Sequence, residues 1–301
     1  MSTDRHLAGA PISWGVCEVP GWGAMLPPDR VFGEMAGLGL TATELGPVDD
    51  YLPLDAAAIR GALAPHGLQL LGGFVPLVLH DAAARDEALA QARRVASAMA
   101  DAGASVFVLA IVQDAAWSAP QPLDDDGWAT LAAGVDAVAA ATAALGLTTV
   151  VHPHQGTLIE RRAEVDRLAS LSDVAWCLDP GHLALGGYDP LAFVAAHGDR
   201  VAHVHLKDVD LKVAARLNAG ELTLMTAVQA GLFVPLGAGD ADIAALVAAL
   251  DARGYDGWMV LEQDRAITGA PPAPGEGPAR DAAASLEFLR ATTATTTAPA
   301  R

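Results

Sequence analysis

Short apolar segments alternate along the chain with longer, alanine-rich stretches of helical periodicity. The apolar segments predict strands at 10–14, 41–45, 68–75, 105–111, 148–152, 174–178, 201–206 and 257–262. The stretches between them predict helices at 29–38, 55–65, 82–102, 124–145, 160–171, 189–197, 240–253 and 279–291. Both faces of the predicted strands are apolar, which is typical of a parallel sheet covered by helices.

The predicted helices share their boundary residues. Several begin at an aspartate, which caps free backbone N–H groups and suits the helix dipole: Asp29, Asp55, Asp124, Asp189 and Asp240. Several end at a glycine just before the next strand: Gly39, Gly67, Gly103, Gly146 and Gly254.

Eight strand–helix units predict a (β/α)₈ TIM barrel, for which roughly 250 residues is typical. The alternative is an open doubly wound sheet, but no GxGxxG follows the first strand, which disfavours dinucleotide binding.

One connection is much longer than the others. The segment 208–239 contains a short predicted helix at 221–230 and the apolar run AVQAGLFVPL. Loops of this length are commonly lids or interface segments, so a homo-oligomer, dimer or tetramer, is expected. We therefore expect a single barrel domain over 1–291 with an insert at 208–239, followed by a disordered tail at 292–301.

Composition narrows the class of protein. The 301 residues are 52% hydrophobic, and 18 basic against 36 acidic residues give a formal net charge of −18. This balance argues against nucleic acid or an anionic membrane surface as partner. The apolar residues are interrupted by charges, so no membrane span is predicted, and the N-terminus lacks a signal-peptide pattern. Two cysteines, Cys17 and Cys177, make no disulfide framework. A cytoplasmic enzyme or binding protein is expected.

Groups able to bind a metal gather where the later predicted strands end. They are His152 and His154, Asp179 and the following His182, His203 and His205 with Lys207, and Glu262; Glu44 and His80 lie at the ends of earlier strands. Functional side chains of a barrel project from these strand ends. Each histidine alone is more often a packed core residue, and an aspartate before Pro-Gly is usually a turn residue. Together, His, Asp, His and Glu from four consecutive strands predict a site for Mn²⁺, Co²⁺, Fe²⁺, Zn²⁺ or Mg²⁺.

These motifs resemble those of the xylose-isomerase-like barrel superfamily, which includes sugar isomerases and epimerases, over about residues 8–290. The segments CLDPGHLALGGYDP and HVHLKDVD are specific for the superfamily, whereas TELGP and GLFVPLGAGD followed by LEQD are most similar to its inosose dehydratases. The superfamily binds its metal with Glu, Asp, His and Glu. The resemblance places the last three on Asp179, His205 and Glu262. The first falls on His152, or on His154 if the alignment slips by two residues.

A histidine in place of the first glutamate makes the metal a stronger Lewis acid and removes one of the two carboxylates that epimerases use for proton transfer. The resemblance therefore implies a lyase that dehydrates a cyclic keto-polyol such as scyllo-inosose, with Mn²⁺ or Co²⁺ as the preferred ion. Glu262 or His154 would be the base, and His182 or Lys207 would protonate the leaving hydroxyl or hold the enolate oxygen. Trp14, Glu44 and His80, with His154, His182 and Lys207, would contact the substrate. Trp14 could equally be a packing residue, and Glu44 an ion-pair partner.

Four other functions compete with this interpretation. A ketose isomerase or epimerase, and a lyase of 3-keto-glycosides, would use the same fold and metal. A metal-dependent phosphodiester hydrolase would need a basic groove, which the net charge of −18 opposes. A non-catalytic sugar-binding regulator would be expected to lack one or more ligands.

Overall fold

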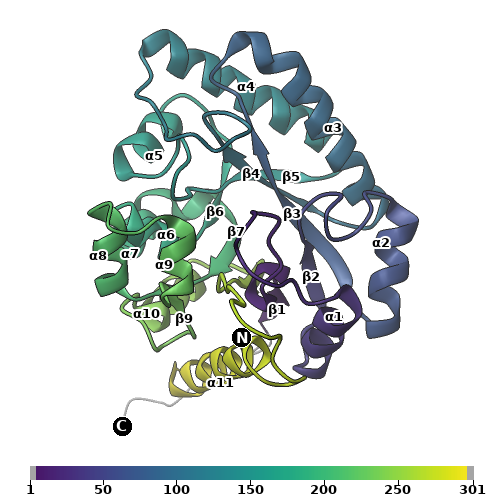
Figure 1. Cartoon of the computed structure of the whole chain (residues 1–301). Helices are drawn as coiled ribbons and strands as arrows, with labels where there is room; N and C mark the ends of the chain where they lie inside the picture. The colour runs from purple at the N-terminus through teal and green to yellow at the C-terminus, as the bar shows by residue number, and fades with distance from the viewer. Residues whose placement is uncertain (1–4, 297–301) are drawn as a thin grey trace.

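A closed barrel of parallel strands forms the centre of the molecule (Figure 1). The computed structural model describes residues 5–296. Within this range the barrel has the strand order β1-β10-β7-β6-β5-β4-β3-β2. Its strands are β1 His6–Gly9, β2 Ala42–Leu45, β3 Gln69–Leu77, β4 Val106–Ile111, β5 Thr148–Val151, β6 Ala175–Leu178, β7 Val201–Leu206 and β10 Trp258–Leu261. The predicted TIM barrel is therefore confirmed.

Helices surround the barrel (Figure 1). They are α1 Pro28–Gly37, α2 Ala56–Leu63, α3 Arg85–Asp101, α4 Asp125–Ala143, α5 Arg162–Ala169, α6 Pro180–Leu185, α7 Pro190–His197, α8 Leu211–Asn218, α9 Leu224–Gln229, α10 Ile243–Ala252 and α11 Pro278–Thr296. Side-chain oxygens of Asp55, Asp124 and Asp189 cap α2, α4 and α7 as the sequence predicts. None of the described helices is long and apolar enough to cross a membrane.

The first strand lies closer to the N-terminus than predicted. Residues 6–9 form β1, whereas Pro11–Trp14, inside the predicted strand, form a 3₁₀ turn, η1. Proline suits the first turn of a helix because it lacks an N–H and its φ is fixed. Gly15 then ends the turn with φ of 82°, a backbone conformation that glycine adopts without steric cost. The apolar sequence 10–14 therefore follows the strand instead of forming it.

The structure contains two helices that the sequence analysis missed. Helix α6 begins directly after Asp179, and α8 precedes the predicted short helix, which is α9. In the segment 208–239, α8 and α9 pack beside each other, and the two-residue strands β8 Asp208–Val209 and β9 Phe233–Val234 pair antiparallel (Figure 1). At the other end, α11 extends to Thr296, where a disordered tail was expected from residue 292. Residues 297–301 of that expected tail lie outside the described residues.

Alternation along the strands divides the barrel into an apolar base and a polar mouth. Small apolar side chains pack together inside the barrel, among them Ala8, Ala42, Val108, Val150 and Val260. On β2, β5, β6 and β10 the next residues of the same parity, at the carboxyl ends of the strands, are Glu44, His152, Asp179 and Glu262. Because side chains two residues apart share a strand face, the sequence brings all of these polar groups into one space above a dry floor.

Candidate active site

The four predicted metal ligands lie together at the carboxyl ends of β5, β6, β7 and β10. Asp179, His205 and Glu262 are buried, and each offers a ligand atom within 4.8 Å of those of the other two. His152 Nε2 lies 3.3 Å from Asp179 Oδ2. The strand ends therefore bring together two carboxylates and two imidazoles, a donor set that suits a divalent transition metal.

Helix α6 fixes the orientation of Asp179. One carboxylate oxygen, Oδ1, accepts a hydrogen bond of 3.0 Å from the backbone N–H of His182 and so caps the helix. The other oxygen, Oδ2, faces His152 and lies 4.0 Å from His205 Nδ1. The interpretation of this aspartate as a turn residue is thus half right, because the same side chain serves the helix and the site.

Glu44 lies beneath the site and bridges two histidines of β7. The Nε2 atoms of His203 and His205 lie 2.7 and 3.0 Å from the same oxygen, Oε1. Burial would raise the pKa of Glu44, but the neighbouring imidazoles outweigh it and hold the pKa at about 2. Glu44 is only 3% exposed, and its partners are two histidines of β7, whereas the alternative expected an ion pair with a neighbouring loop.

His205 is held from both sides. Its Nε2 contacts Glu44, while its Nδ1 faces the Oε2 atom of Glu262. Carboxylate oxygens only accept hydrogen bonds. Burial opposes a second proton on the ring, but Cys177, Glu262 and Glu44 raise the pKa of His205 well above its usual value. Both ring nitrogens therefore carry protons in the metal-free protein, and Nδ1 becomes a ligand atom when its proton leaves. A histidine ligand whose other nitrogen donates to a carboxylate is a recurrent arrangement in metal sites.

Lys207 is fully buried among carboxylates. Its Nζ lies 2.9 Å from Asp264 Oδ1, 3.0 Å from Glu262 Oε1 and 3.4 Å from Asp179 Oδ2. Burial opposes its charge, but these three carboxylates raise the pKa of Lys207 well above its usual value. His182 Nε2 lies 3.0 Å from the same ammonium. Lys207 therefore stays protonated and donates hydrogen bonds inside the site.

His152 and His154 occupy different places. His152 is fully buried beside Asp179, whereas His154 lies higher, with its ring centroid 3.9 Å from that of His182. His154 Nδ1 donates a 2.8 Å hydrogen bond to the carbonyl of Gln155, which leaves the lone pair on Nε2. Burial, followed by the charges of His152 and Lys207, lowers the pKa of His154 to about 3. Of the two, His152 is the one that lies beside Asp179.

The donors fit a metal ion in a further respect. Among the described residues, His152 Nδ1 is buried without a hydrogen-bond partner. Buried polar atoms in proteins are nearly always paired, so an unpaired ring nitrogen beside buried carboxylates fits a site that lacks its ion. A divalent cation would also balance the charge of the carboxylates.

Two predicted substrate contacts lie away from this cluster. Trp14 is fully buried in the apolar layer with Phe32 and Met35, and its indole N–H donates to Glu34 at 2.9 Å. Its placement is that of a packing residue, the alternative considered for it. His80 Nε2 lies 3.1 Å from the side-chain amide of Gln113, so it belongs to the loops after β3 and β4.

Sequence reasoning missed three residues of the site. Trp117 stacks on Phe74 with ring planes 16° apart, and its ring centroid lies 5.7 Å from that of His154. Trp117 is also 39% exposed and has a positive φ of 56°, which is rare outside glycine and is often found at functional sites. The third, Asp264, contacts Lys207; burial raises its pKa to about 6. Its place two residues after Glu262, just beyond the end of β10, was the available signal.

Comparisons with known proteins agree with this geometry. The sequence pattern of the family described as xylose isomerase-like TIM barrel matches residues 32–292. The chain is 34% identical to the inosose dehydratase of Geobacillus kaustophilus, covering 86% of this chain and 87% of that protein. It is 32% identical to the rhizopine catabolism protein MocC of Rhizobium meliloti, covering 86% and 81%. Among solved structures, D-allulose 3-epimerase from Methylomonas sp. matches with a TM-score of 0.69 and 17% identity, covering 96% and 98%, a likeness of fold.

Proposed function

The chain belongs to the xylose isomerase-like TIM barrel family, and from this premise we propose that it is a metal-dependent hydro-lyase that dehydrates a cyclic keto-polyol such as scyllo-inosose. The observation that carries the proposal is the buried His152, Asp179, His205 and Glu262 cluster in a chain 34% identical to an inosose dehydratase. A keto-polyol is neutral, so binding it requires hydrogen-bond donors and acceptors but no basic pocket.

The metal would be held by His152, Asp179, His205 and Glu262. When bound there, a divalent ion such as Mn²⁺ or Co²⁺ supplies Lewis acidity, which polarises a ketone and stabilises the charge of the enolate. The polypeptide orients these ligands: α6 fixes Asp179, and Glu44 fixes His205.

His154 is the stronger candidate for the base that removes the proton next to the ketone. Its Nε2 carries a lone pair, and burial, which lowers its pKa to about 3, keeps the ring neutral. The same shift weakens it as a base, so its position and not its basicity supports this assignment. The second candidate, Glu262, has its oxygens facing Lys207 and His205. A base needs an accessible lone pair within hydrogen-bond reach of the proton, and His154 is half-buried whereas Glu262 is buried.

Lys207 and Asp264 would assist departure of the β-hydroxyl. Lys207 remains charged, so it stabilises oxygen anions by hydrogen bonding instead of releasing its own proton. Asp264, with a pKa of about 6, exchanges a proton near neutral pH. His182 touches Lys207 and the ring of His154, and so positions both.

Trp117 and Phe74 would replace Trp14 as the apolar wall of the substrate site. The stacked pair lies beside His154. One face of a cyclic polyol carries C–H groups that pack against an aromatic ring, while its hydroxyls turn toward polar partners. A substrate packed on Trp117 would therefore present its ring to His154 Nε2.

A ketose isomerase or epimerase, and a lyase of 3-keto-glycosides, stay as alternatives. The proton shift of an epimerase uses two carboxylates that face each other across the substrate, and His152 stands where the first would be. Product analysis separates the reactions, because dehydration lowers the product mass by one water and isomerisation leaves it unchanged.

The test begins with protein stripped of metal by a chelator and assayed on scyllo-inosose. We expect no turnover until Mn²⁺ or Co²⁺ is added, and a product lacking one water. Asp179→Asn should abolish both metal binding and turnover, since the amide keeps the helix cap but loses the charge. Asp242→Asn, at the equivalent cap of α10, is the matched control and should retain both. Full turnover in chelated protein or in Asp179→Asn contradicts the proposal.

A further inference from the structure

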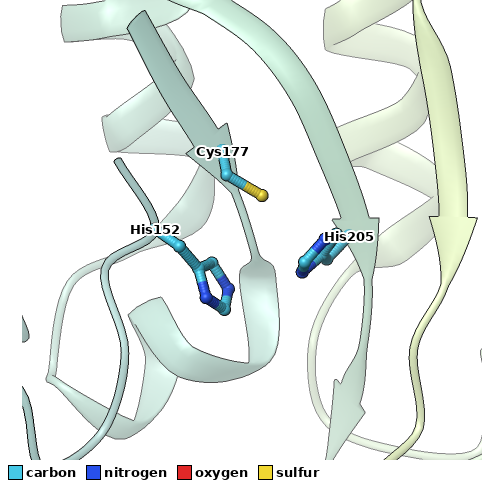
Figure 2. Close-up of side chains that lie close together, drawn as sticks. All are labelled: His152, Cys177 and His205. Carbon is cyan, nitrogen blue, oxygen red and sulfur yellow. The ribbon is translucent and has the colours of Figure 1, made fainter. Parts of the chain in front are cut away.

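Cys177 has no role in the proposed reaction, yet it lies directly below the ligand cluster. It is fully buried on β6, two residues before Asp179, and the strand period turns both side chains into the barrel. Figure 2 shows the thiol converging on the rings of His152 and His205, which come from the neighbouring strand ends of β5 and β7. These three residues offer donor atoms that all lie within 4.8 Å of one another.

From this convergence we propose that His152, Cys177 and His205 form a second metal site, specific for thiophilic divalent ions such as Zn²⁺ or Cd²⁺, whose occupation excludes the catalytic ion. Two imidazoles and a thiolate are the donors that soft or borderline ions prefer, whereas carboxylates suit Mg²⁺ and Mn²⁺. The thiol would bind as a thiolate, with its proton released to solvent.

The two sites lie at successive levels of the barrel. The upper level, Asp179, His205 and Glu262, is rich in oxygen, and the lower level has nitrogen and sulfur donors. Below the thiol the interior is lined by Val108, Val150 and Val260, among other apolar residues. A dry apolar shell excludes water, so an ion at the lower level would be enclosed by protein.

His205 makes the sites mutually exclusive. Its Nε2 hydrogen-bonds to Glu44, so Nδ1 is the nitrogen that can bind an ion, with loss of its proton. One nitrogen serves one ion, and His152 is likewise shared with the upper set. An ion drawn to Cys177 would thus remove two ligands from the catalytic position. The inference rests on the proposed function only for the expected loss of turnover, because the binding of ions is measured without substrate.

The two cysteines of the chain provide a matched pair of variants. Cys17→Ser leaves Cys177 as the sole thiol, and Cys177→Ser removes it. Each metal-free protein is titrated with Cd²⁺ and with Co²⁺ while the ultraviolet sulfur-to-metal charge-transfer absorption is recorded. Binding is repeated with Mn²⁺ present, and free Mn²⁺ is followed by electron paramagnetic resonance.

In Cys17→Ser we expect the charge-transfer band at one equivalent of Cd²⁺, with release of Mn²⁺. In Cys177→Ser the band should be absent and Cd²⁺ affinity should fall about 100-fold or more, since even groups that only support a ligand contribute about 10–100-fold. The Mn²⁺ affinity of Cys177→Ser should equal that of the wild type, which also shows that the variant is folded. If the buried hydroxyl prevents folding, Cys177→Ala takes its place. No band in Cys17→Ser, or a band without release of Mn²⁺, overturns the proposal. If only the dehydratase assay fails, the proposed function is wrong and the second site stands.

Discussion

Replacement of Lys207 by methionine provides the sharpest test of the site's electrostatics. Its ammonium lies within 3.4 Å of three buried carboxylates. At an effective dielectric constant near 20, each contact of this length corresponds to about 5 kcal/mol of attraction. Desolvation offsets part of this, and removal of one partner from a buried ion pair costs about 3–5 kcal/mol. We expect metal-free Lys207→Met to lose that amount of unfolding free energy, or about 6–20 °C in Tm.

The same change should strengthen metal binding. The ammonium and a metal ion compete for Asp179 and Glu262, so without Lys207 the Mn²⁺ affinity should rise by about tenfold, equivalent to about 1.4 kcal/mol. At saturating Mn²⁺ the deficit in unfolding free energy relative to wild type should therefore shrink by about 1.4 kcal/mol. Turnover of scyllo-inosose should fall by about 100-fold or more even at saturating Mn²⁺, because the hydrogen-bond donor is missing.

Urea unfolding of metal-free and Mn²⁺-loaded protein, with calorimetric titration of Mn²⁺, measures both effects. The only other lysine in the chain, Lys212, is exposed at the start of α8, and Lys212→Met is the matched control. It should change neither quantity. The reasoning is refuted if metal-free Lys207→Met unfolds within about 1 kcal/mol of wild type, or if its Mn²⁺ affinity falls.

Four further variants test the metal ligand, the base, the apolar wall and the buried charge below the site. His152→Gln should weaken Mn²⁺ binding by about 10–100-fold, as measured by calorimetry. His154→Gln should leave Mn²⁺ affinity unchanged and lower kcat by about 100-fold in steady-state kinetics. The opposite pattern would show that His154 is the ligand. Trp117→Ala should raise KM about tenfold, as loss of about 1.4 kcal/mol of stacking implies, and an unchanged KM would remove it from the wall. The pKa of Glu44 is about 2 in the folded protein against an ordinary 4.5, so its ionisation stabilises the metal-free fold above pH 4.5 and that contribution is lost as pH falls from 4.5 to 2. Unfolding free energies of wild type and Glu44→Gln should converge across that window, and parallel curves would contradict the assignment.

Most of the barrel could be predicted because each strand–helix unit carries its own local sequence signals. Paired signals of an aspartate cap and a closing glycine locate helices such as α2 and α4 within a few residues. The prediction fails where an element is too short to show a periodic pattern of apolar residues. Helix α6 has six residues and starts at Pro180, and its capping aspartate also fits a turn. Strand β1 has four residues, and the apolar sequence that follows it is the stronger pattern.

The meeting of the candidate ligands was predictable for a different reason. Consecutive parallel strands of a barrel end at one rim, so residues at the ends of β5, β6, β7 and β10 must meet, whatever their separation in the chain. What local pattern could not supply is the depth of each side chain. A register shift between Thr43 and Glu44 in β2 accompanies the placement of the carboxylate under the histidines, and bulges of this kind re-aim side chains. The loop conformation that brings Trp117 to the site is even harder to predict from the sequence than the depth of a strand side chain.

The charges buried in the mouth give an independent reason to expect a divalent ion. Glu44, Asp179, Glu262 and Asp264 are each less than 10% exposed, and within the described chain Lys207 is the one buried lysine that faces them. Four carboxylates against one ammonium leave a large negative excess in a low-dielectric space, which costs several kcal/mol per unpaired charge. A divalent cation between Asp179 and Glu262, with His205 neutral as a ligand, would remove most of this excess. Since Lys207 already occupies the side toward Asp264, the cation would lie on the side of His152 and His205.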